Sequence, residues 1–209
     1  GWGKASWGKI YGQWLCGCGV MVYDFDIFSP EKLLKVIEDF KVTSFCAPPT
    51  VYRYFIKKDM KKFDLSHLEH ITTAGEALNP EVFEQVHKQT GLQIMEGFGQ
   101  TESVLMLGNL VGSTAKIGSL GKPTPLYNIM IADNEGNRLP ANEVGEIVVI
   151  PSENQHGIFM GYCGNEDLYA NVWKYGIYHT GDTAYMDDDG YYWYVGRICL
   201  LYTSPSPRD

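Results

Sequence analysis

The stretch Glu96-Gly97-Phe98-Gly99-Gln100-Thr101-Glu102 contains the residue types that bind a phosphate and a metal ion. Its two glycines allow a ligand to come close to the backbone. Thr101 offers a hydroxyl and an N–H to a phosphate, Phe98 offers the face of a ring, and Glu102 offers the oxygen atoms that Mg²⁺ prefers. A plain turn with a solvated acid would show the same spacing, so the pattern alone leaves both interpretations open.

Two later residues suit other parts of a nucleotide. The carboxylate of Asp182 can accept two hydroxyl hydrogen bonds, which suits a ribose; the alternative is an aspartate in a turn beside Gly181. Arg197 presents a fixed fork of donors to anionic oxygens, or else forms a salt bridge to an acidic hairpin. Glu76 either belongs to the same site or caps the helix that begins at Asn79.

The elements that position these residues alternate between strand and helix in the first half of the chain. Ser29-Pro30 and Asn79-Pro80 are typical helix starts, and Gly91 is a typical helix stop. The expected helices are Ser29–Phe40, Thr50–Lys58 and Asn79–Gly91, and the expected strands are Val42–Ala47, Leu68–Thr73 and Leu92–Met95. This alternation predicts a parallel sheet with right-handed crossovers. The loops Ala74–Glu76 and Glu96–Thr101 then lie at the carboxyl ends of strands, where such sheets bind ligands.

After about residue 115 the pattern changes to short strands separated by turns. Turn residues gather at Asp133–Gly136 and Asp187–Gly190. The expected strands are Ile129–Ile131, Gly145–Ile150, Ile177–Thr180, Ala184–Met186 and Tyr191–Val195. The predicted fold class is therefore α/β: a parallel sheet with crossover helices, followed by a smaller antiparallel β subdomain, either an open sheet or a small distorted barrel.

Composition limits the function. The 209 residues carry a net charge of −8 and no stripe of Lys and Arg, which argues against a nucleic-acid partner. The most apolar window, Trp14–Phe25, is shorter than the roughly 20 residues of a transmembrane helix. The 5 cysteines do not have the spacing of zinc ligands, and the sequence shows no secretory signal. We therefore expect a cytoplasmic protein with reduced thiols, several of them buried.

Four motifs in this order resemble the adenylate-forming superfamily, which includes acyl-CoA synthetases, luciferases and the adenylation domains of peptide synthetases. They are Thr73–Leu78, Glu96–Glu102, Tyr178–Asp182 and Gly196-Arg197. The sequence is most similar to the acetyl- and medium-chain acyl-CoA synthetase branch, over roughly residues 1 to 197. The resemblance implies part of the large domain of the adenylate-forming fold.

The resemblance also implies a role for each matched residue. Thr101 would hold the α-phosphate and Glu102 the metal ion, and these two are the expected catalytic residues. Asp182 would bind both ribose hydroxyls, and Arg197 would reach the ribose or a phosphate. The implied nucleotide-binding residues are Gly75, Glu76, Ala77, Glu96, Gly97, Phe98, Gly99, Gln100, Thr101, Asp182 and Arg197. The implied cofactors are ATP or AMP, Mg²⁺ and coenzyme A.

The family reaction activates a carboxylic acid with ATP to acyl-AMP and then transfers the acyl group to CoA, mainly through positioning and charge neutralisation. The opening residues resemble the segment that faces the acyl group and CoA, which makes Trp2 an expected substrate contact. Acetate-specific members place a Trp where this chain has Gly99, so we expect a medium-chain or branched fatty acid. The alternatives are an acetate or aryl-acid CoA ligase, and a non-catalytic AMP-binding module or inactive remnant.

Three parts of the family pattern are absent from these residues. The phosphate loop with its Lys would precede Gly1, the small domain with the adenylation Lys would follow Arg197, and Cys199 stands where a hinge acid is expected. We therefore expect the 209 residues alone to be inactive. The predicted organisation is 1–115 as the α/β subdomain with the adenine and phosphate loops, 116–197 as the antiparallel subdomain with Asp182, and 198–209 as a truncated or mis-joined tail.

Overall fold

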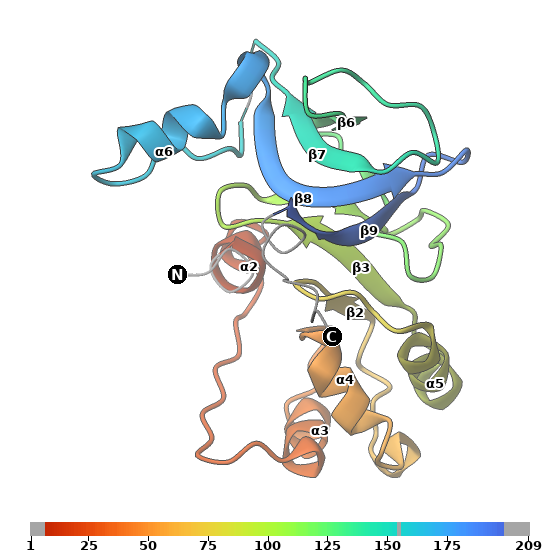
Figure 1. Ribbon diagram of the computed structural model, residues 1–209. Coiled ribbons are helices and arrows are strands. Elements are labelled where there is room, and N and C mark those ends of the chain that lie inside the picture. Colours follow the sequence, from red (N-terminus) through yellow and green to blue (C-terminus); the bar gives the residue numbers. More distant parts are fainter. Residues whose placement is uncertain (1–6, 154–155, 199–209) are drawn as a thin grey trace, which may run out of the picture.

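A computed structural model describes residues 7–153 and 156–198 (Figure 1). The helical elements are η1 (Trp7–Tyr11), α2 (Gly12–Leu15), α3 (Pro30–Asp39), α4 (Pro49–Phe55), η2 (Met60–Lys62), α5 (Pro80–Thr90), α6 (Glu166–Asn171) and η3 (Lys174–Gly176). The strands are β1 (Ser44–Cys46), β2 (His70–Thr73), β3 (Ile94–Gly99), β4 (Leu105–Gly108), β5 (Lys122–Pro123), β6 (Asn128–Ala132), β7 (Gly145–Ile150), β8 (Tyr178–Met186) and β9 (Tyr192–Arg197). Trp2, Cys199 and the rest of the predicted tail after Ile198 lie outside the described residues.

The first sheet has the order β1-β2-β3-β4-β5. The β1–β2 and β2–β3 pairs are parallel, and α4 and α5 lie in the connections between these strands. The β3–β4 and β4–β5 pairs are antiparallel. Figure 1 shows α3, α4 and α5 gathered at one end of the molecule, the second sheet at the other, and β3 between them. The predicted parallel sheet with crossover helices is confirmed over β1 to β3.

Helix boundaries in this half follow from local capping. The Ser29 side chain accepts a hydrogen bond from the Lys32 N–H at 3.3 Å, so it caps α3. The Asn79 side chain caps α5 in the same manner, and Gly91 ends that helix with φ of 77°. Phe40 departs from the predicted apolar stripe: it is 69% exposed because α3 already ends at the preceding residue.

The glycine-rich stretch after the third strand is not the turn that the sequence predicts. β3 continues through it, because Gly97 and Phe98 pair with the antiparallel strand β4. A Cβ on Gly99 would lie 2.5 Å from the carbonyl oxygen of Val104, so the close approach of β4 itself requires glycine there. The chain turns only at Thr101-Glu102.

The second sheet has the order β6-β7-β8-β9 and is antiparallel throughout. The sequence predicts one strand before Gly181-Asp182 and a second strand after it, whereas the structure has a single strand, β8, that runs through both residues. Register shifts against β7 and against β9 absorb the irregularity, and Gly181 adopts φ of 72° within the strand. Asp182 is therefore a strand residue, and its pairing partner is Arg197 on β9.

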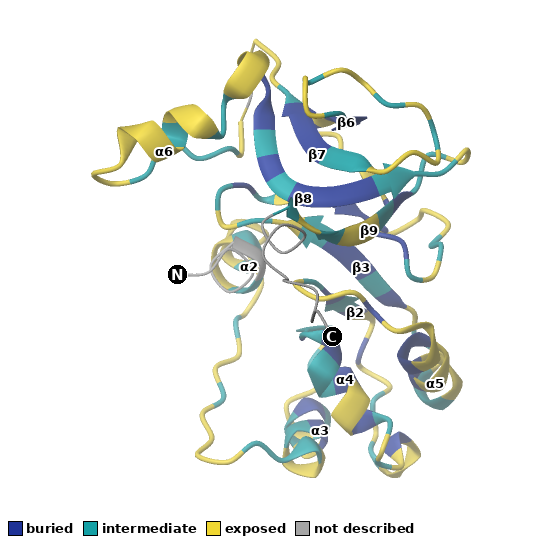
Figure 2. Cartoon of the chain, in the orientation of Figure 1, coloured by how far each residue is buried: buried dark blue, intermediate teal, exposed yellow. Residues whose placement is uncertain are grey.

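Three apolar cores support the sheets, and the smallest lies around Val148 on β7. One packs α3, α4 and α5 against β1, β2 and β3, around Leu34, Tyr52 and Val86. Another packs β4 against the second sheet, around Met106, Ile147 and Tyr178. Figure 2 shows the buried residues concentrated in β6, β7 and β8, and α6 mostly exposed. The predicted boundaries at residues 115 and 197 stay predictions, although the first sheet extends to β5.

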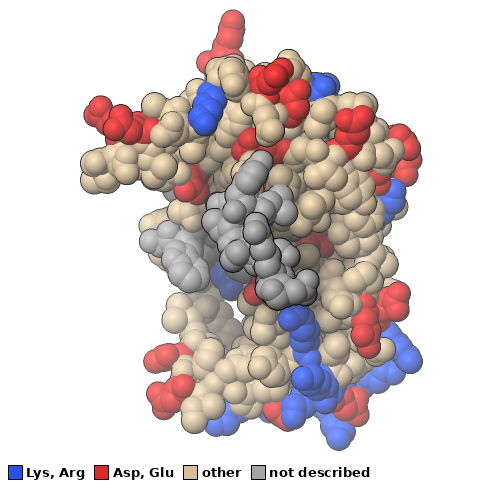
Figure 3. Space-filling model, viewed as in Figure 1, with Lys and Arg blue, Asp and Glu red and all other residues tan. Residues whose placement is uncertain are grey.

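The surface differs from the sequence expectation in its cysteines. Cys16, Cys18 and Cys163 are exposed and Cys46 is partly buried. None of these four described cysteines is fully buried, whereas the sequence predicts that several are buried. Figure 3 shows Lys and Arg side chains gathered around α4, α5 and the segment between them, with acidic side chains over both ends of the molecule. Within the described residues, no helix has both the length and the apolar character needed to cross a membrane.

Candidate nucleotide-binding site

One cavity of about 1240 Å³, which we term the larger cavity, brings together the predicted site residues. The loop after β2, the strand β3 and the turn that follows it form one side, and Asp182 and Arg197 from the second sheet contribute to the other. The predicted residues that line it are Gly75, Glu76, Ala77, Glu96, Gly97, Phe98, Gly99, Gln100, Thr101, Glu102, Asp182 and Arg197. Their individual roles stay predictions.

The loop after β2 is held against α4. The Thr50 hydroxyl donates to Glu76 Oε2 at 3.2 Å, and Arg53 Nη2 lies 3.8 Å from the same oxygen. Gly75 turns the chain with φ of 93°, a conformation that favours glycine. Since Asn79 caps α5, Glu76 is not needed as a helix cap.

Glu96 is one of two buried acids that line the larger cavity, with 4% of its surface exposed. Its Oε1 accepts a hydrogen bond from the Leu78 N–H at 3.1 Å. Burial raises the pKa of Glu96 to about 7, and the Leu78 N–H acts in the opposite direction. The carboxyl group is thus poised to exist in both protonation states near neutral pH.

Three buried oxygen atoms on the lining of the larger cavity have no hydrogen-bond partner among the described residues. They are Oε2 of Glu96, Oγ1 of Thr73 and Oδ1 of Asn109. Thr73 and Glu96 lie opposite each other on β2 and β3, so two of these atoms belong to adjacent strands. A buried polar atom without a partner costs free energy, which a polar ligand or water in the cavity would recover.

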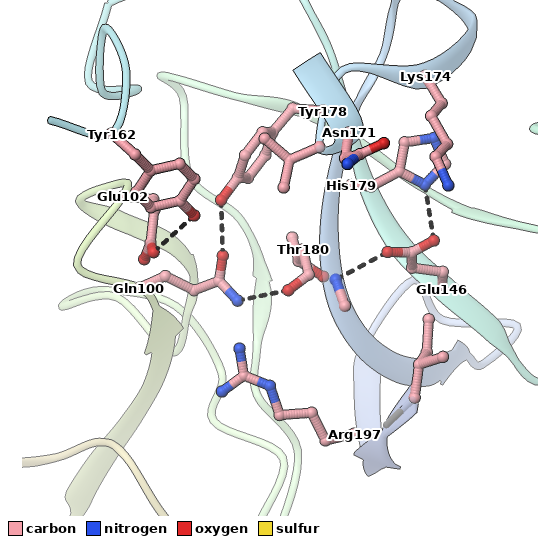
Figure 4. A pocket seen from close by; sticks show the side chains of 13 residues that line it. Gln100, Glu102, Glu146, Tyr162, Asn171, Lys174, Tyr178, His179, Thr180 and Arg197 are labelled. Atoms are coloured by element: carbon pink, nitrogen blue, oxygen red, sulfur yellow. Dashed lines mark hydrogen bonds and ion pairs between the residues drawn. The ribbon is translucent and has the colours of Figure 1, made fainter. Parts of the chain in front are cut away.

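Glu102 is held at the turn after β3 by a tyrosine from a distant segment. The Tyr162 hydroxyl donates to Glu102 Oε1 at 3.0 Å (Figure 4). Burial raises the pKa of Tyr162 to about 12, and the hydrogen bond to the Glu102 carboxylate adds to that increase. The described residues contain no group of three His, Cys, Asp or Glu side chains placed to hold a metal ion. A single carboxylate still suits Mg²⁺, which usually binds one or two protein carboxylates together with substrate phosphates.

Asp182 is held by donors from both sheets and is 5% exposed. Gln100 Nε2 donates to its Oδ2 at 2.6 Å, and the Tyr194 hydroxyl donates to its Oδ1 at 3.2 Å. Arg197 Nε lies 3.8 Å from Oδ1. Burial raises the pKa of Asp182, while the Arg197 charge and the two hydrogen bonds act against that rise. Each carboxylate oxygen keeps acceptor capacity for a hydroxyl of a ligand.

The sequence profile of the AMP-binding enzyme family matches residues 4–163, which is most of the chain. The chain belongs to the AMP-binding enzyme family. It is 41% identical over 199 residues to the mouse mitochondrial acyl-coenzyme A synthetase ACSM3, covering 94% of this chain and 34% of that protein. It is 40% identical over 198 residues to human mitochondrial ACSM4, with the same coverage. The chain thus spans about a third of the length of these relatives.

Solved structures of adenylate-forming enzymes share the fold of this AMP-binding family member. The anthranilate CoA ligase AuaEII, crystallised with anthranoyl-AMP, matches with a TM-score of 0.84 and 30% identity, over 92% of this chain and 37% of that one. An acyl-CoA synthetase of Brucella canis matches with a TM-score of 0.84 and 28% identity, over 94% and 36% of the two chains. The superfamily expected from the motifs and its α/β fold are confirmed.

The expectation of a cytoplasmic location is wrong. The curated relatives ACSM3 and ACSM4 are named as mitochondrial proteins. The inference from the cysteines failed because reduced thiols and the lack of a recognisable secretory signal fit several compartments equally well.

A smaller cavity of about 430 Å³ adjoins the site of this AMP-binding family member (Figure 4). Gln100, Glu102 and Arg197 line both cavities and therefore form the wall between them. On the other side of the smaller cavity lie Asn171, Lys174 and His179. None of these three was predicted as a site residue, although His179 lies inside the motif that ends at Asp182.

Sequence reasoning also missed the residues that support the predicted ones. Glu146 Oε1 accepts from the Gly181 N–H at 2.7 Å, and its Oε2 lies 2.7 Å from His179 Nδ1, so it fixes the backbone next to Asp182. Tyr162 likewise holds a predicted site residue in place, through its hydrogen bond to Glu102. Neither Glu146 nor Tyr162 lies in a recognised motif, and only the fold brings them to the site.

Proposed function

We propose that this chain is the nucleotide-binding part of an ATP-dependent acyl-CoA synthetase. The observation that carries the proposal is the larger cavity, where the turn at Thr101-Glu102 from one sheet and the Asp182–Arg197 pair from the other line the same space. The names of the relatives, acyl-coenzyme A synthetases, support the same reaction class.

In the proposed reaction, a carboxylate oxygen of the acid attacks the α-phosphorus of ATP, and the bond to the β-phosphate oxygen breaks to release pyrophosphate. The CoA thiolate then attacks the acyl carbon, and AMP leaves with the oxygen that joined it to the acyl group. Thr101 would donate to the α-phosphate, Asp182 would accept from the ribose hydroxyls, and Arg197 would offset phosphate charge. The protein thus contributes positioning and electrostatics to both steps.

Glu102 is the residue that would hold Mg²⁺. Its Oε1 is oriented by Tyr162, and it borders both cavities. When bound, the ion supplies positive charge beside the phosphates. Loss of the Glu102 carboxylate should therefore weaken metal and nucleotide binding together, whereas loss of Asp182 should weaken nucleotide binding alone.

For the acid, we propose a medium-chain or branched fatty acid. The argument rests on Gly99, which lines the larger cavity without a side chain. The same glycine is also required by the packing against β4, because a Cβ there would lie 2.5 Å from the Val104 carbonyl oxygen. Trp2, the other proposed acyl contact, lies outside the described residues.

From the names of its relatives we also propose a mitochondrial location, which cell fractionation followed by detection with an antibody tests directly.

The test is thioester formation by the intact protein that contains this chain, with ATP, Mg²⁺, CoA and straight-chain acids from acetate to decanoate. We expect kcat/KM to be higher for acids of about four to ten carbons than for acetate, because each buried CH₂ adds roughly 0.8 kcal/mol. A preference for acetate would contradict the proposed substrate. No ATP-dependent thioester with any carboxylic acid would contradict the proposed function.

A matched pair of variants connects that activity to the site. Asp182→Asn keeps the shape of the side chain but removes its charge, and we expect kcat/KM for ATP to fall roughly 10- to 100-fold. Asp59→Asn makes the same change at an exposed aspartate before η2, outside both cavities, and should leave the rate unchanged.

A further inference from the structure

The amide of Gln100 is bonded at both ends to one strand of the opposite sheet. Its Nε2 donates to the Thr180 carbonyl oxygen at 2.8 Å and to Asp182 Oδ2 at 2.6 Å. Its Oε1 accepts from the Tyr178 hydroxyl at 2.9 Å. Figure 4 shows the side chain reaching from the turn after β3 to β8, between Tyr178 and Thr180.

These partners fix the orientation of the amide. Asp182 and Thr180 present only acceptors to it, so the NH₂ group must face them, and the oxygen must then face the Tyr178 hydroxyl. A rotated amide would place its oxygen against a carboxylate and a carbonyl. Tyr178 is 2% exposed and its ring packs in the second core, so the network rests on rigid groups.

Gln100 immediately precedes Thr101 and Glu102, and it contacts Asp182 directly. It is therefore the side chain that joins the proposed phosphate-binding turn to the proposed ribose-binding carboxylate. We propose that Gln100 is a positioning residue that sets the Asp182 carboxylate for the two ribose hydroxyls, rather than a residue that contacts the nucleotide with its own amide. This inference rests on the proposed function, because it requires that Asp182 binds a ribose.

The experiment compares binding of AMP and of 2′,3′-dideoxy-AMP to the intact protein by titration calorimetry. Gln100→Met keeps the length of the side chain but removes every hydrogen bond to β8. We expect its affinity for AMP to fall roughly tenfold, because Asp182 loses a donor that sets its geometry. Its affinity for dideoxy-AMP should stay at the wild-type value, because that ligand has no hydroxyl for Asp182 to bind.

Two further variants sharpen the test. Tyr178→Phe removes only the hydroxyl that orients the amide, and should produce a smaller loss that is again confined to AMP. Gln85→Met makes the control substitution at an exposed position of α5, where Gln and Met have similar helix propensities, and should change neither affinity. If Gln100→Met does not fold, Tyr178→Phe still decides the question.

Equal losses for both ligands would overturn the inference, since they would indicate a contact with the nucleotide elsewhere or a general distortion. Unchanged affinity for AMP in both Gln100→Met and Tyr178→Phe would overturn it as well. If the wild type binds AMP no better than dideoxy-AMP, or binds neither, the ribose site of the proposed function fails and the inference falls with it. If the wild type prefers AMP over dideoxy-AMP and the variants show the same preference, the role of Gln100 is refuted while the proposed ribose site stands.

Discussion

Asp182 and Arg197 lie directly opposite each other on β8 and β9, which brings Arg197 Nε to 3.8 Å from Asp182 Oδ1. Asp182 is almost fully buried, while about half of the Arg197 side chain is exposed. The buried acid therefore depends on a partner that solvent and ligands can reach. Strand register, rather than sequence proximity, makes this pair.

The first prediction concerns the pH dependence of ribose binding. Arg197 lowers the pKa of Asp182 against the larger effect of burial, so Arg197→Met should raise that pKa further. Hydroxyl donors bind the ionised carboxylate, so affinity falls as pH drops through this pKa. The midpoint of that fall should therefore lie at higher pH in Arg197→Met than in the wild type. Titration with adenosine, which has no phosphate to titrate, measures it.

Arg138→Met is the matched control for that experiment, because Arg138 is exposed and borders neither cavity. Its midpoint should coincide with that of the wild type. A midpoint in Arg197→Met at the wild-type pH, or below it, would show that Arg197 does not control the ionisation of Asp182.

The second prediction concerns stability and Glu96. Burial raises its pKa in the folded state to about 7, above the value in the unfolded chain. The folded state therefore binds the proton more tightly, and stability falls as pH rises from the unfolded to the folded pKa and is level above it. The total loss is roughly 3 kcal/mol. Glu96→Gln has no proton to lose, so its advantage over the wild type should grow between the ordinary pKa of 4.5 and the folded value of about 7.

Urea unfolding of the intact protein at a series of pH values measures this difference. Glu84→Gln, at an exposed position of α5, is the control and should follow the wild type at every pH. Parallel curves for Glu96→Gln and the wild type would mean that Glu96 is ionised in the folded protein throughout this range.

The third prediction concerns Tyr162. Removing its hydroxyl frees Glu102 Oε1 from the donor that orients it, and loss of such supporting contacts typically weakens metal binding 10- to 100-fold. Tyr162→Phe should therefore raise the Mg²⁺ concentration needed to bind ATP by roughly tenfold at the lower end of that range. Tyr169→Phe removes a hydroxyl from the same aromatic cluster and should have no such effect. If ATP binding by the two variants needs the same Mg²⁺ concentration, the Tyr162 hydroxyl does not orient Glu102 for the metal ion.

The fourth prediction concerns Gly121, which precedes β5 and lies against the end of β4. Gly121 has φ of 85°, and a Cβ there would collide with the backbone of Gly108 and Asn109. Gly121→Ala should cost roughly 2–5 kcal/mol, from backbone strain and overlap together. Gly112 has φ of 84° but open space around it, so Gly112→Ala should cost only the strain, roughly 1–2 kcal/mol. Thermal unfolding of the two variants separates overlap from strain, and equal losses would contradict the structure here.

The sequence predicted most where local chemistry decides the structure. The caps at Ser29, Asn79 and Gly91 act through neighbours in the chain, and the structure has each helix boundary where these residues predict it. The motif residues from Gly75 to Arg197 were placed in one site by resemblance, and one cavity does bring them together. Their individual contacts with a nucleotide stay predictions.

The sequence predicted least where a distant strand decides the structure. The glycines at 97 and 99 are typical of a turn, yet pairing with β4 extends β3 through them. Gly181 is also typical of a turn, yet bulges on both sides keep it inside β8. Tyr162 and Glu146 support site residues from far along the chain, a relationship that no local pattern contains.

The wall formed by Gln100, Glu102 and Arg197 has a practical consequence for mutagenesis. A substitution at any of these three positions changes the outline of two cavities at once, so a mutational scan there reports a sum of two effects. Glu96 borders only the larger cavity and Glu146 only the smaller one. Libraries that vary these two positions independently would change the lining of one cavity at a time, although Glu146 also holds the Gly181 N–H beside Asp182.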